Sequence, residues 1–203
     1  MQLVIRLHDV NTGLGAELET KDKRAEKARE EGFSCVHLAF SKVIKGVTFD
    51  YAALSEGLAH YTKRVFGRNG LDVAVLGCYL NLAHPDREKL REIQSRYFGH
   101  IRVAALMGAG VVGTETGAPN AEYRLDANTH TKEALLSFMR GLEPVLDAAE
   151  RYGVRLAIEP VWNHIVYTPQ AAAEVVKAMG SRNLRIIFDP VNLLSAENLD
   201  RRE

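Results

Sequence analysis

Short apolar segments alternate with longer amphipathic ones along the whole chain, and this alternation constrains the fold more than any other feature. Segments of the length and composition of strands are Leu3–His8, Cys35–Phe40, Leu71–Leu80, Val111–Glu115, Arg155–Glu159 and Leu184–Asp189. The intervening segments have helical patterns. In one of them Leu135, Phe138 and Leu142 recur at spacings of three and four residues, which places them on one apolar stripe. This order predicts parallel strands connected by helices.

Start and stop signals for helices lie between these strands. Asp50 is expected to cap the second helix, which runs towards Gly67. Thr168 places a capping hydroxyl before Pro169, a residue favoured in the first turn of a helix. Gly180 follows the same helix where a C-terminal glycine is expected.

The number of units favours a barrel. Six strand–helix units in 203 residues take about 30 residues each, and eight such units approach the ~250 residues typical of a closed barrel. We expect an α/β fold of the (β/α)8 TIM-barrel type, incomplete, with about six of the eight units in one domain over residues 1–203. A doubly wound sheet is the competing architecture. Its glycine-rich turn is missing, since Asn11-Thr12-Gly13-Leu14-Gly15 lacks the full GxGxxG spacing.

Composition and charge exclude several classes of partner. The 26 basic and 26 acidic residues are interspersed, so the sequence predicts no broad positive surface for nucleic acid or an anionic membrane. No apolar run is long enough to span a bilayer, and we expect a cytoplasmic protein. Cys35 and Cys78 are isolated within strand segments, which favours buried reduced thiols over a disulfide.

Two strand ends match each other one unit apart. Glu159-Pro160-Val161 and Asp189-Pro190-Val191 both follow apolar strands. Because side chains alternate across a strand, Glu159 should point opposite to Ile158, and Asp189 opposite to Phe188. Large apolar residues should face the helices, which leaves both carboxylates inside the barrel. Proline ends the strand pairing, so the acids lie at the C-terminal rim, where barrel enzymes have their active sites.

Paired carboxylates of this kind favour a metal site. They repel each other and lose hydration unless protons or a cation intervene. A divalent cation such as Mg²⁺ or Mn²⁺ accepts oxygen ligands and removes this repulsion. The alternative is that each acid pairs with a basic residue such as Arg155 or Arg185. Two acids in matched settings favour Glu159 and Asp189 as metal ligands.

Several motifs resemble a known family. The segments Ile158–Pro160 and Phe188–Leu194, with His164 and Thr168-Pro169, resemble the xylose isomerase-like barrel superfamily, in particular the sugar phosphate isomerases/epimerases. The segments 81–86, after the third strand, and 112–117, on and after the fourth, also resemble this family. The resemblance implies a divalent metal, Mn²⁺, Mg²⁺ or Co²⁺ rather than Zn²⁺, held by a glutamate, an aspartate, a histidine and a second glutamate. Glu159 and Asp189 match the first two, and the other two would lie after Glu203.

The same resemblance implies the chemistry. Glu159 would act as a catalytic acid/base that moves a proton next to a carbonyl of a sugar or sugar phosphate, through an enediolate. With half of the ligands, the 203-residue chain alone is expected to have little or no activity. An inosose-type dehydratase and a hydroxypyruvate-type isomerase use the same proton abstraction. A non-catalytic alternative is an incomplete barrel that needs a partner to complete its sheet, and a homo-oligomer also stays open.

Four further residues are candidate substrate contacts. His84, after the third strand, is placed to reach a substrate hydroxyl or to cap the next helix. Glu115 ends the fourth strand, where it is expected to contact substrate or to pair with a cation. His164 lies in the loop after the fifth strand. Asn192 is placed at the rim to bond substrate or to stabilise a turn. It also stands where the related apurinic endonucleases have a histidine, which disfavours DNA cleavage.

Overall fold

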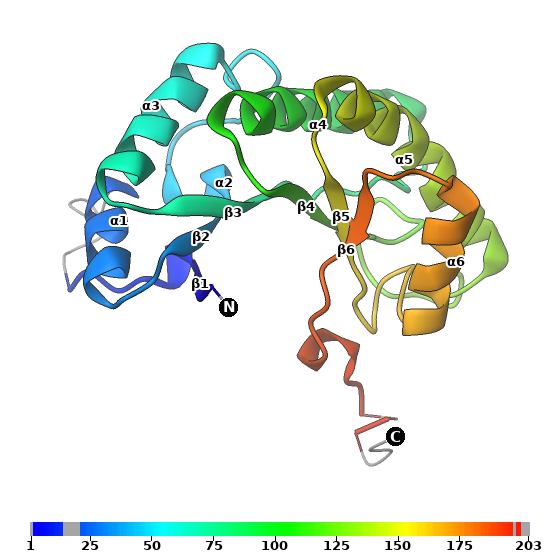
Figure 1. Cartoon of the computed structure of the whole chain (residues 1–203). Coiled ribbons are helices and arrows are strands. Elements are labelled where there is room, and N and C mark those ends of the chain that lie inside the picture. The colour runs from blue at the N-terminus through cyan, green and yellow to red at the C-terminus, as the bar shows by residue number, and fades with distance from the viewer. Residues whose placement is uncertain (1, 14–20, 197, 200–203) are drawn as a thin grey trace. The chain divides into compact units, whose positions relative to one another are not determined.

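A computed structural model of the chain describes residues 2–13, 21–196 and 198–199, and within these ranges six strands form one sheet (Figure 1). The strands are β1 (Val4–Arg6), β2 (Cys35–Leu38), β3 (Asp72–Gly77), β4 (Val111–Glu115), β5 (Leu156–Glu159) and β6 (Leu184–Ile186). They lie in chain order from β1 to β6, and the pairs β1–β2, β2–β3 and β5–β6 are parallel. A doubly wound sheet reverses its strand order at one point, whereas this sheet does not. The α/β fold of an incomplete TIM barrel with about six units is therefore confirmed.

Helices connect consecutive strands. They are α1 (Lys21–Glu30), α2 (Phe40–Val43), α3 (Glu56–Arg68), α4 (Arg87–Met107), α5 (Lys132–Tyr152) and α6 (Pro169–Met179), with 3₁₀ turns η1 (Leu7–Asp9) and η2 (Val191–Leu193). Among the described residues, no helix is long and apolar enough to cross a membrane.

Most strands end earlier than the sequence pattern predicts. β3 stops at Gly77 instead of Leu80, and β6 stops at Ile186 instead of Asp189. β1 gives way to η1 after Arg6, and β2 ends before Phe40, which begins α2. After β2 the apolar residues continue past the strand because the helix that follows also buries side chains, as the fully buried Phe40 of α2 shows. In the turn after β1, residues 14 and 15 lie outside the described residues.

One predicted cap is wrong and another is confirmed. The Asp50 carboxylate accepts a hydrogen bond from the backbone amide of Ala53 at 2.8 Å and so stabilises a separate turn. α3 starts later, after Ser55, whose hydroxyl accepts from Leu58 N at 3.2 Å. Thr168 caps α6 as predicted. The difference arises because an aspartate can close a turn as readily as it caps a helix.

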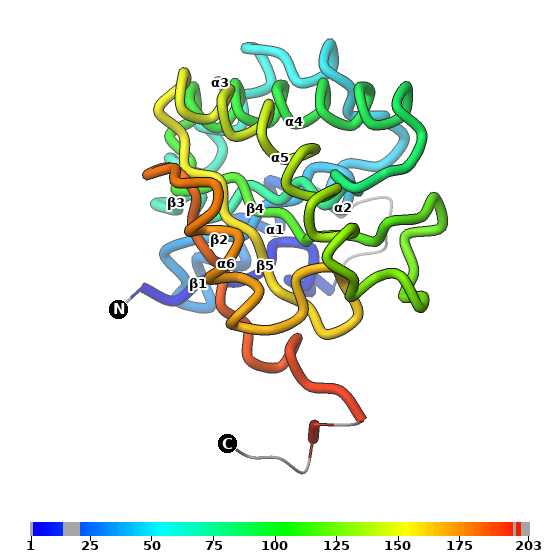
Figure 2. Tube along the Cα trace, turned by 90° about the vertical axis from the view of Figure 1, so that its right-hand side faces the viewer, coloured from blue at the N-terminus to red at the C-terminus, as the bar shows by residue number. Residues whose placement is uncertain are grey.

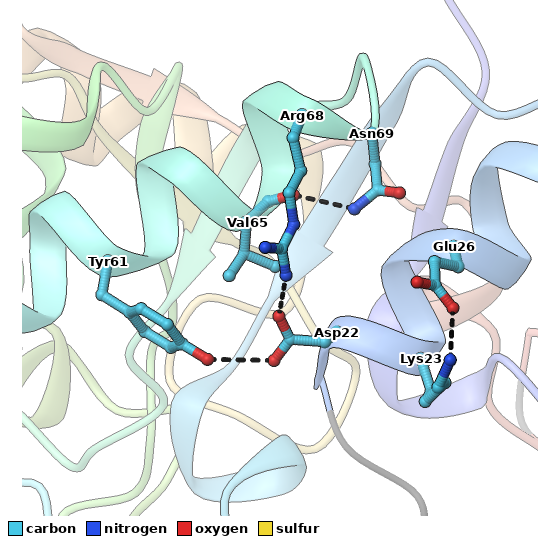
Figure 3. A network of polar contacts seen from close by, with 7 residues as sticks. All are labelled: Asp22, Lys23, Glu26, Tyr61, Val65, Arg68 and Asn69. Carbon is cyan, nitrogen blue, oxygen red and sulfur yellow. Dashed lines mark hydrogen bonds and ion pairs between the residues drawn. The ribbon is translucent and has the colours of Figure 1, made fainter.

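The chain forms two compact units, of which the first contains residues 1–78, 95–112 and 152–154. Asp22 of α1 accepts hydrogen bonds from Tyr61 and Arg68 of α3, and this network joins the two helices (Figure 3). The Arg68 side chain is 64% exposed, so the ion pair contributes about 1 kcal/mol or less. Cys35 and Cys78 are buried free thiols, as predicted, and burial raises the pKa of Cys78.

The second unit contains residues 79–94, 113–151 and 155–203. The predicted apolar stripe of α5 is buried, with Phe138 and Leu142 fully enclosed. β5 is buried along its whole length. From β5 the chain passes through α6 to β6 and then to η2, a path that can be followed in Figure 2. This unit carries every residue that the sequence analysis proposed for the site.

The outer side of β6 is apolar and accessible. Ile186 and Phe188 share a depression of about 390 Å³ with Ala172 and Val176 of α6, so they face the helix as predicted. They are not buried, however, because Ile186 is 37% and Phe188 70% exposed. Within the described residues no further strand pairs with β6, and α6 alone covers only part of this face.

Candidate active site

Glu159 is the last residue of β5 and is only 8% exposed. The side-chain amide of Asn192 donates a hydrogen bond to Glu159 Oε1 at 2.6 Å. Asn192 is itself held in place, because its carbonyl accepts from the backbone amide of Trp162 at 2.8 Å. The hydrogen bond therefore fixes the orientation of a buried carboxylate at the C-terminal end of the sheet.

Asp189 lies beyond the end of β6 and is partly exposed. Its Oδ1 accepts a hydrogen bond from the backbone amide of Val191 at 2.9 Å, which forms an Asx turn leading into η2. Among the described residues there is no group of three or more His, Cys, Asp or Glu side chains that could hold a metal. Glu159 and Asp189 offer oxygen donors, which suit a hard divalent cation, but they are two ligands only.

His84 lies in a helix-capping turn. Its Nδ1 accepts from the backbone amide of Asp86 at 3.1 Å. Asp86 in turn accepts from the backbone amides of Glu88 and Lys89, and these bonds lower the pKa of its carboxyl. Asp86 is therefore the capping residue of α4 and His84 braces its backbone, while the contact of His84 with substrate stays a prediction.

Glu115 and His164 come together although they are far apart in the chain. Glu115 Oε2 accepts a hydrogen bond from the Tyr123 hydroxyl at 3.2 Å. The Tyr123 ring meets the His164 imidazole edge to face, with ring centroids 5.3 Å apart. His164 is 8% exposed, and its Nδ1 lies 3.9 Å from Glu115 Oε2. Burial lowers the pKa of His164 to about 4, so its ring is neutral at pH 7.

Hydrogen bonds tie together the loops that carry these residues. The buried Asn81, after β3, donates to the carbonyls of Ala118 and Asn120 in the loop after β4, at 2.8 and 2.9 Å. In that same loop, the carbonyl of Gly117 accepts a hydrogen bond at 3.0 Å from the backbone amide of Ile165, which lies in the loop after β5. Three consecutive loops therefore hold each other in position.

Sequence reasoning missed Tyr123 and the structural role of Asn81. Tyr123 has a backbone φ of 55°, which is uncommon for a residue other than glycine. The side chain of Asn120 accepts from Arg124 N at 3.1 Å and donates to Arg124 O at 2.8 Å, and so encloses the turn that contains Tyr123. The only sequence signal is a loop with several Asn and Asp residues after the fourth strand.

The structure thus contains two clusters of polar side chains that are candidates for the site. Glu159 pairs with Asn192, and Glu115 lies beside Tyr123 and His164. Both groups lie in the second unit and come from the C-terminal ends of β4 and β5 or the loops that follow strands. A buried, oriented carboxylate can accept and return a proton, and a neutral imidazole beside a carboxylate can bind hydroxyl groups.

Solved structures share this fold at low sequence identity. The IolI protein with a bound zinc atom has a TM-score of 0.70 and 18% identity over 95% of this chain and 64% of its own. D-psicose 3-epimerase with D-fructose has a TM-score of 0.66 and 16% identity, covering 92% of this chain and 62% of its own. A xylose isomerase-like TIM barrel protein from Mycobacterium smegmatis, in complex with magnesium, has a TM-score of 0.66 and 18% identity. The match covers 95% of this chain and 65% of its own.

This chain therefore spans less than two thirds of the length of each of these proteins. No curated protein matches it. Residues 25–203 match the family described as xylose isomerase-like TIM barrel. The chain belongs to the xylose isomerase-like TIM barrel family.

Proposed function

We propose that the chain carries the acid/base and metal-binding part of a sugar isomerase or epimerase, acting on a sugar or sugar phosphate. The observation that carries this proposal is the buried carboxylate of Glu159, oriented by Asn192 at 2.6 Å. Membership of the family supports it. So do the solved structures of D-psicose 3-epimerase and of the Escherichia coli 3-keto-D-glucoside 4-epimerase, which share the fold.

Glu159 would remove a proton from the carbon next to the substrate carbonyl. Because Asn192 holds Oε1, rotation of the carboxylate is restricted, and the proton is taken from a fixed direction. Burial keeps bulk water away from the carboxylate and from the enediolate that results. Return of a proton to the same or the neighbouring carbon would then give the epimer or the isomer.

Glu159 and Asp189 would hold a divalent cation between the ends of β5 and β6. When bound, this cation would polarise the substrate oxygens and stabilise the enediolate. The zinc and magnesium in two of the related structures support a divalent cation, without selecting one. With two ligands among the described residues, we expect the 203-residue chain to bind Mn²⁺ weakly.

The test is exchange of a substrate α-proton with solvent deuterium. It should be made on the protein as its gene encodes it, whether or not that extends beyond Glu203, with ketohexoses and sugar phosphates as substrates. We expect metal-dependent exchange, reduced about 100-fold or more in Glu159→Gln, because a positioned acid/base contributes about 10²–10⁴ in rate. Glu122→Gln, a change at an exposed carboxylate, is the control. Exchange that survives both chelation and Glu159→Gln would contradict the proposal.

Product analysis separates the related reactions. An isomerase or epimerase conserves the mass of the substrate, whereas a dehydratase of the inosose type releases water. A hydroxypyruvate-type isomerase would act on a three-carbon substrate. Mass spectrometry of the same reactions distinguishes these outcomes.

One observation favours a second, non-catalytic function. Phe188 and Val191 are 70% and 69% exposed beside the edge of β6, and an exposed apolar edge of this kind is suited to pairing with another chain. In this case wild-type protein would show no exchange with any substrate. It would instead associate through this edge, and Phe188→Asp would weaken the association in sedimentation experiments.

A further inference from the structure

A buried imidazole faces a carboxylate across a gap that is too wide for a direct hydrogen bond. His164 Nδ1 lies 3.9 Å from Glu115 Oε2. Nδ1 is buried and has no hydrogen-bond partner among the described residues. A buried polar atom of this kind costs stability unless a ligand or water satisfies it. A small polar group between the two side chains would satisfy Nδ1, and because Nδ1 is buried the group would enter only as the side chains move slightly apart.

We propose that this gap binds one hydroxyl group of a polyhydroxylated ligand. The hydroxyl would donate to Glu115 Oε2 and accept from the Nδ1–H of neutral His164. Hydrogen bonds of about 2.7–2.9 Å to each atom are compatible with a separation of 3.9 Å between them. That the ligand is the sugar substrate rests on the proposed function, whereas the hydroxyl site itself rests on these contacts.

The chemistry of the two groups selects a hydroxyl over an ion. A hydroxyl both donates and accepts, and so it satisfies a carboxylate and an imidazole N–H together. An anion would be repelled by Glu115. A cation would find only two ligands, since the described residues contain no group of three suitable side chains. The predicted ligand is therefore a neutral polyol or sugar.

Tyr123 is a positioning residue for this site. Its hydroxyl donates to Glu115 Oε2, and its ring packs edge to face against His164. Its backbone φ of 55° is maintained by the turn that Asn120 encloses. Such a conformation persists only where the surrounding contacts determine it. Tyr123 thus controls the separation of the carboxylate and the imidazole.

The site lies beside the residue proposed for proton transfer. Glu115 ends β4 and Glu159 ends β5, which are neighbouring strands of one sheet. Their C-terminal ends lie at the same edge of the sheet. We therefore assign the gap to a substrate hydroxyl close to the carbon that loses its proton.

Sorbitol is the probe that tests this site. It has the hydroxyl groups of a sugar and no carbonyl, so it cannot undergo the proposed proton transfer. Its dissociation constant is measured by NMR titration of the protein. We expect Glu115→Gln and His164→Phe to weaken binding about tenfold, the loss of one hydrogen bond to a charged or buried group. Tyr123→Phe, which keeps the ring, should weaken it about threefold.

Matched substitutions control for these changes. Glu122→Gln, His130→Gln and Tyr167→Phe alter exposed side chains of the same kinds in the same unit and should leave the dissociation constant unchanged.

A second measurement does not depend on variants: the ring nitrogen resonances of His164 should shift when sorbitol is added. Equal binding by wild type, Glu115→Gln and His164→Phe would overturn the proposal, as would unchanged His164 resonances at saturating sorbitol.

The two proposals can fail separately. If sorbitol binding depends on Glu115 and His164 but no substrate exchanges its α-proton, the hydroxyl site stands and the proposed function fails. If exchange depends on Glu159 but sorbitol binding does not depend on Glu115 and His164, the proposed function stands and the hydroxyl site is overturned.

Discussion

At the scale of single residues, one glycine allows the loops after β3 and β4 to approach each other. Gly117 has a φ of +71°, and a Cβ atom there would overlap Asn81 Oδ1. Asn81 cannot move away easily, because its amide donates to two carbonyls and its Oδ1 accepts from Ala83 N. The conformation and the close contact both require glycine at this position.

Gly117→Ala should therefore lower the free energy of unfolding by about 2–4 kcal/mol, from backbone strain and the overlap together. Gly180→Ala is the control. Gly180 has a φ of +62° with open space around it, so only the strain of about 1 kcal/mol applies. Urea denaturation measures both variants. Equal losses would show that the contact with Asn81 contributes nothing.

At the scale of elements, α5 packs directly on the loop after β3. A Cβ atom at Gly141, in the middle of α5, would collide with the backbone carbonyl of Leu82. The carbonyl of Gly141 accepts a hydrogen bond from the Gln94 side chain of α4 at 3.0 Å. Glycine is a poor helix former, so its presence here reflects this close approach of backbones.

We expect Gly141→Ala to lower the free energy of unfolding by about 3 kcal/mol or more, since the helix must shift and lose its packing. Gly67→Ala makes the same change in α3, where nothing lies within 4 Å of the new Cβ. It should raise the stability by about 0.5–1 kcal/mol. Thermal unfolding followed by circular dichroism compares the two. A Gly141→Ala variant as stable as wild type would disprove the close packing.

At the scale of the whole molecule, buried histidines make stability depend on pH. Burial lowers the pKa of His37, His100 and His164 to about 4. In the unfolded chain a histidine titrates near 6.5. Between these values the unfolded state binds more protons than the folded state, so acidification favours unfolding. Their contribution is complete above pH 6.5 and is lost as the pH falls towards 4.

Stability should therefore decrease from pH 7 to pH 5, by up to about 1.4 kcal/mol per pH unit for each such histidine. His100→Gln should reduce this pH dependence, because His100 is 5% exposed and would no longer take up a proton on unfolding. His60→Gln changes an exposed histidine of α3 and should leave the slope as it is. Urea midpoints at pH 7, 6 and 5 give the three slopes. Identical slopes in wild type and His100→Gln would contradict the prediction.

Much of the fold can be read from local chemistry. The order of strands and helices, the cap at Thr168 and the buried stripe of α5 follow from patterns within about twenty residues. Glu159 at the buried end of β5 follows from the alternation of side chains in a strand. These features depend on the period of the backbone and on short hydrogen bonds, which neighbouring residues determine.

The three-dimensional packing decided the rest. Strand ends depend on where the neighbouring strand stops bonding, so β6 ends before Asp189 although the apolar pattern continues. The contacts of Glu159 with Asn192, and of Glu115 with Tyr123 and His164, join separate loops. No local pattern encodes such contacts, because they form only when the sheet brings the ends of its strands to a common edge.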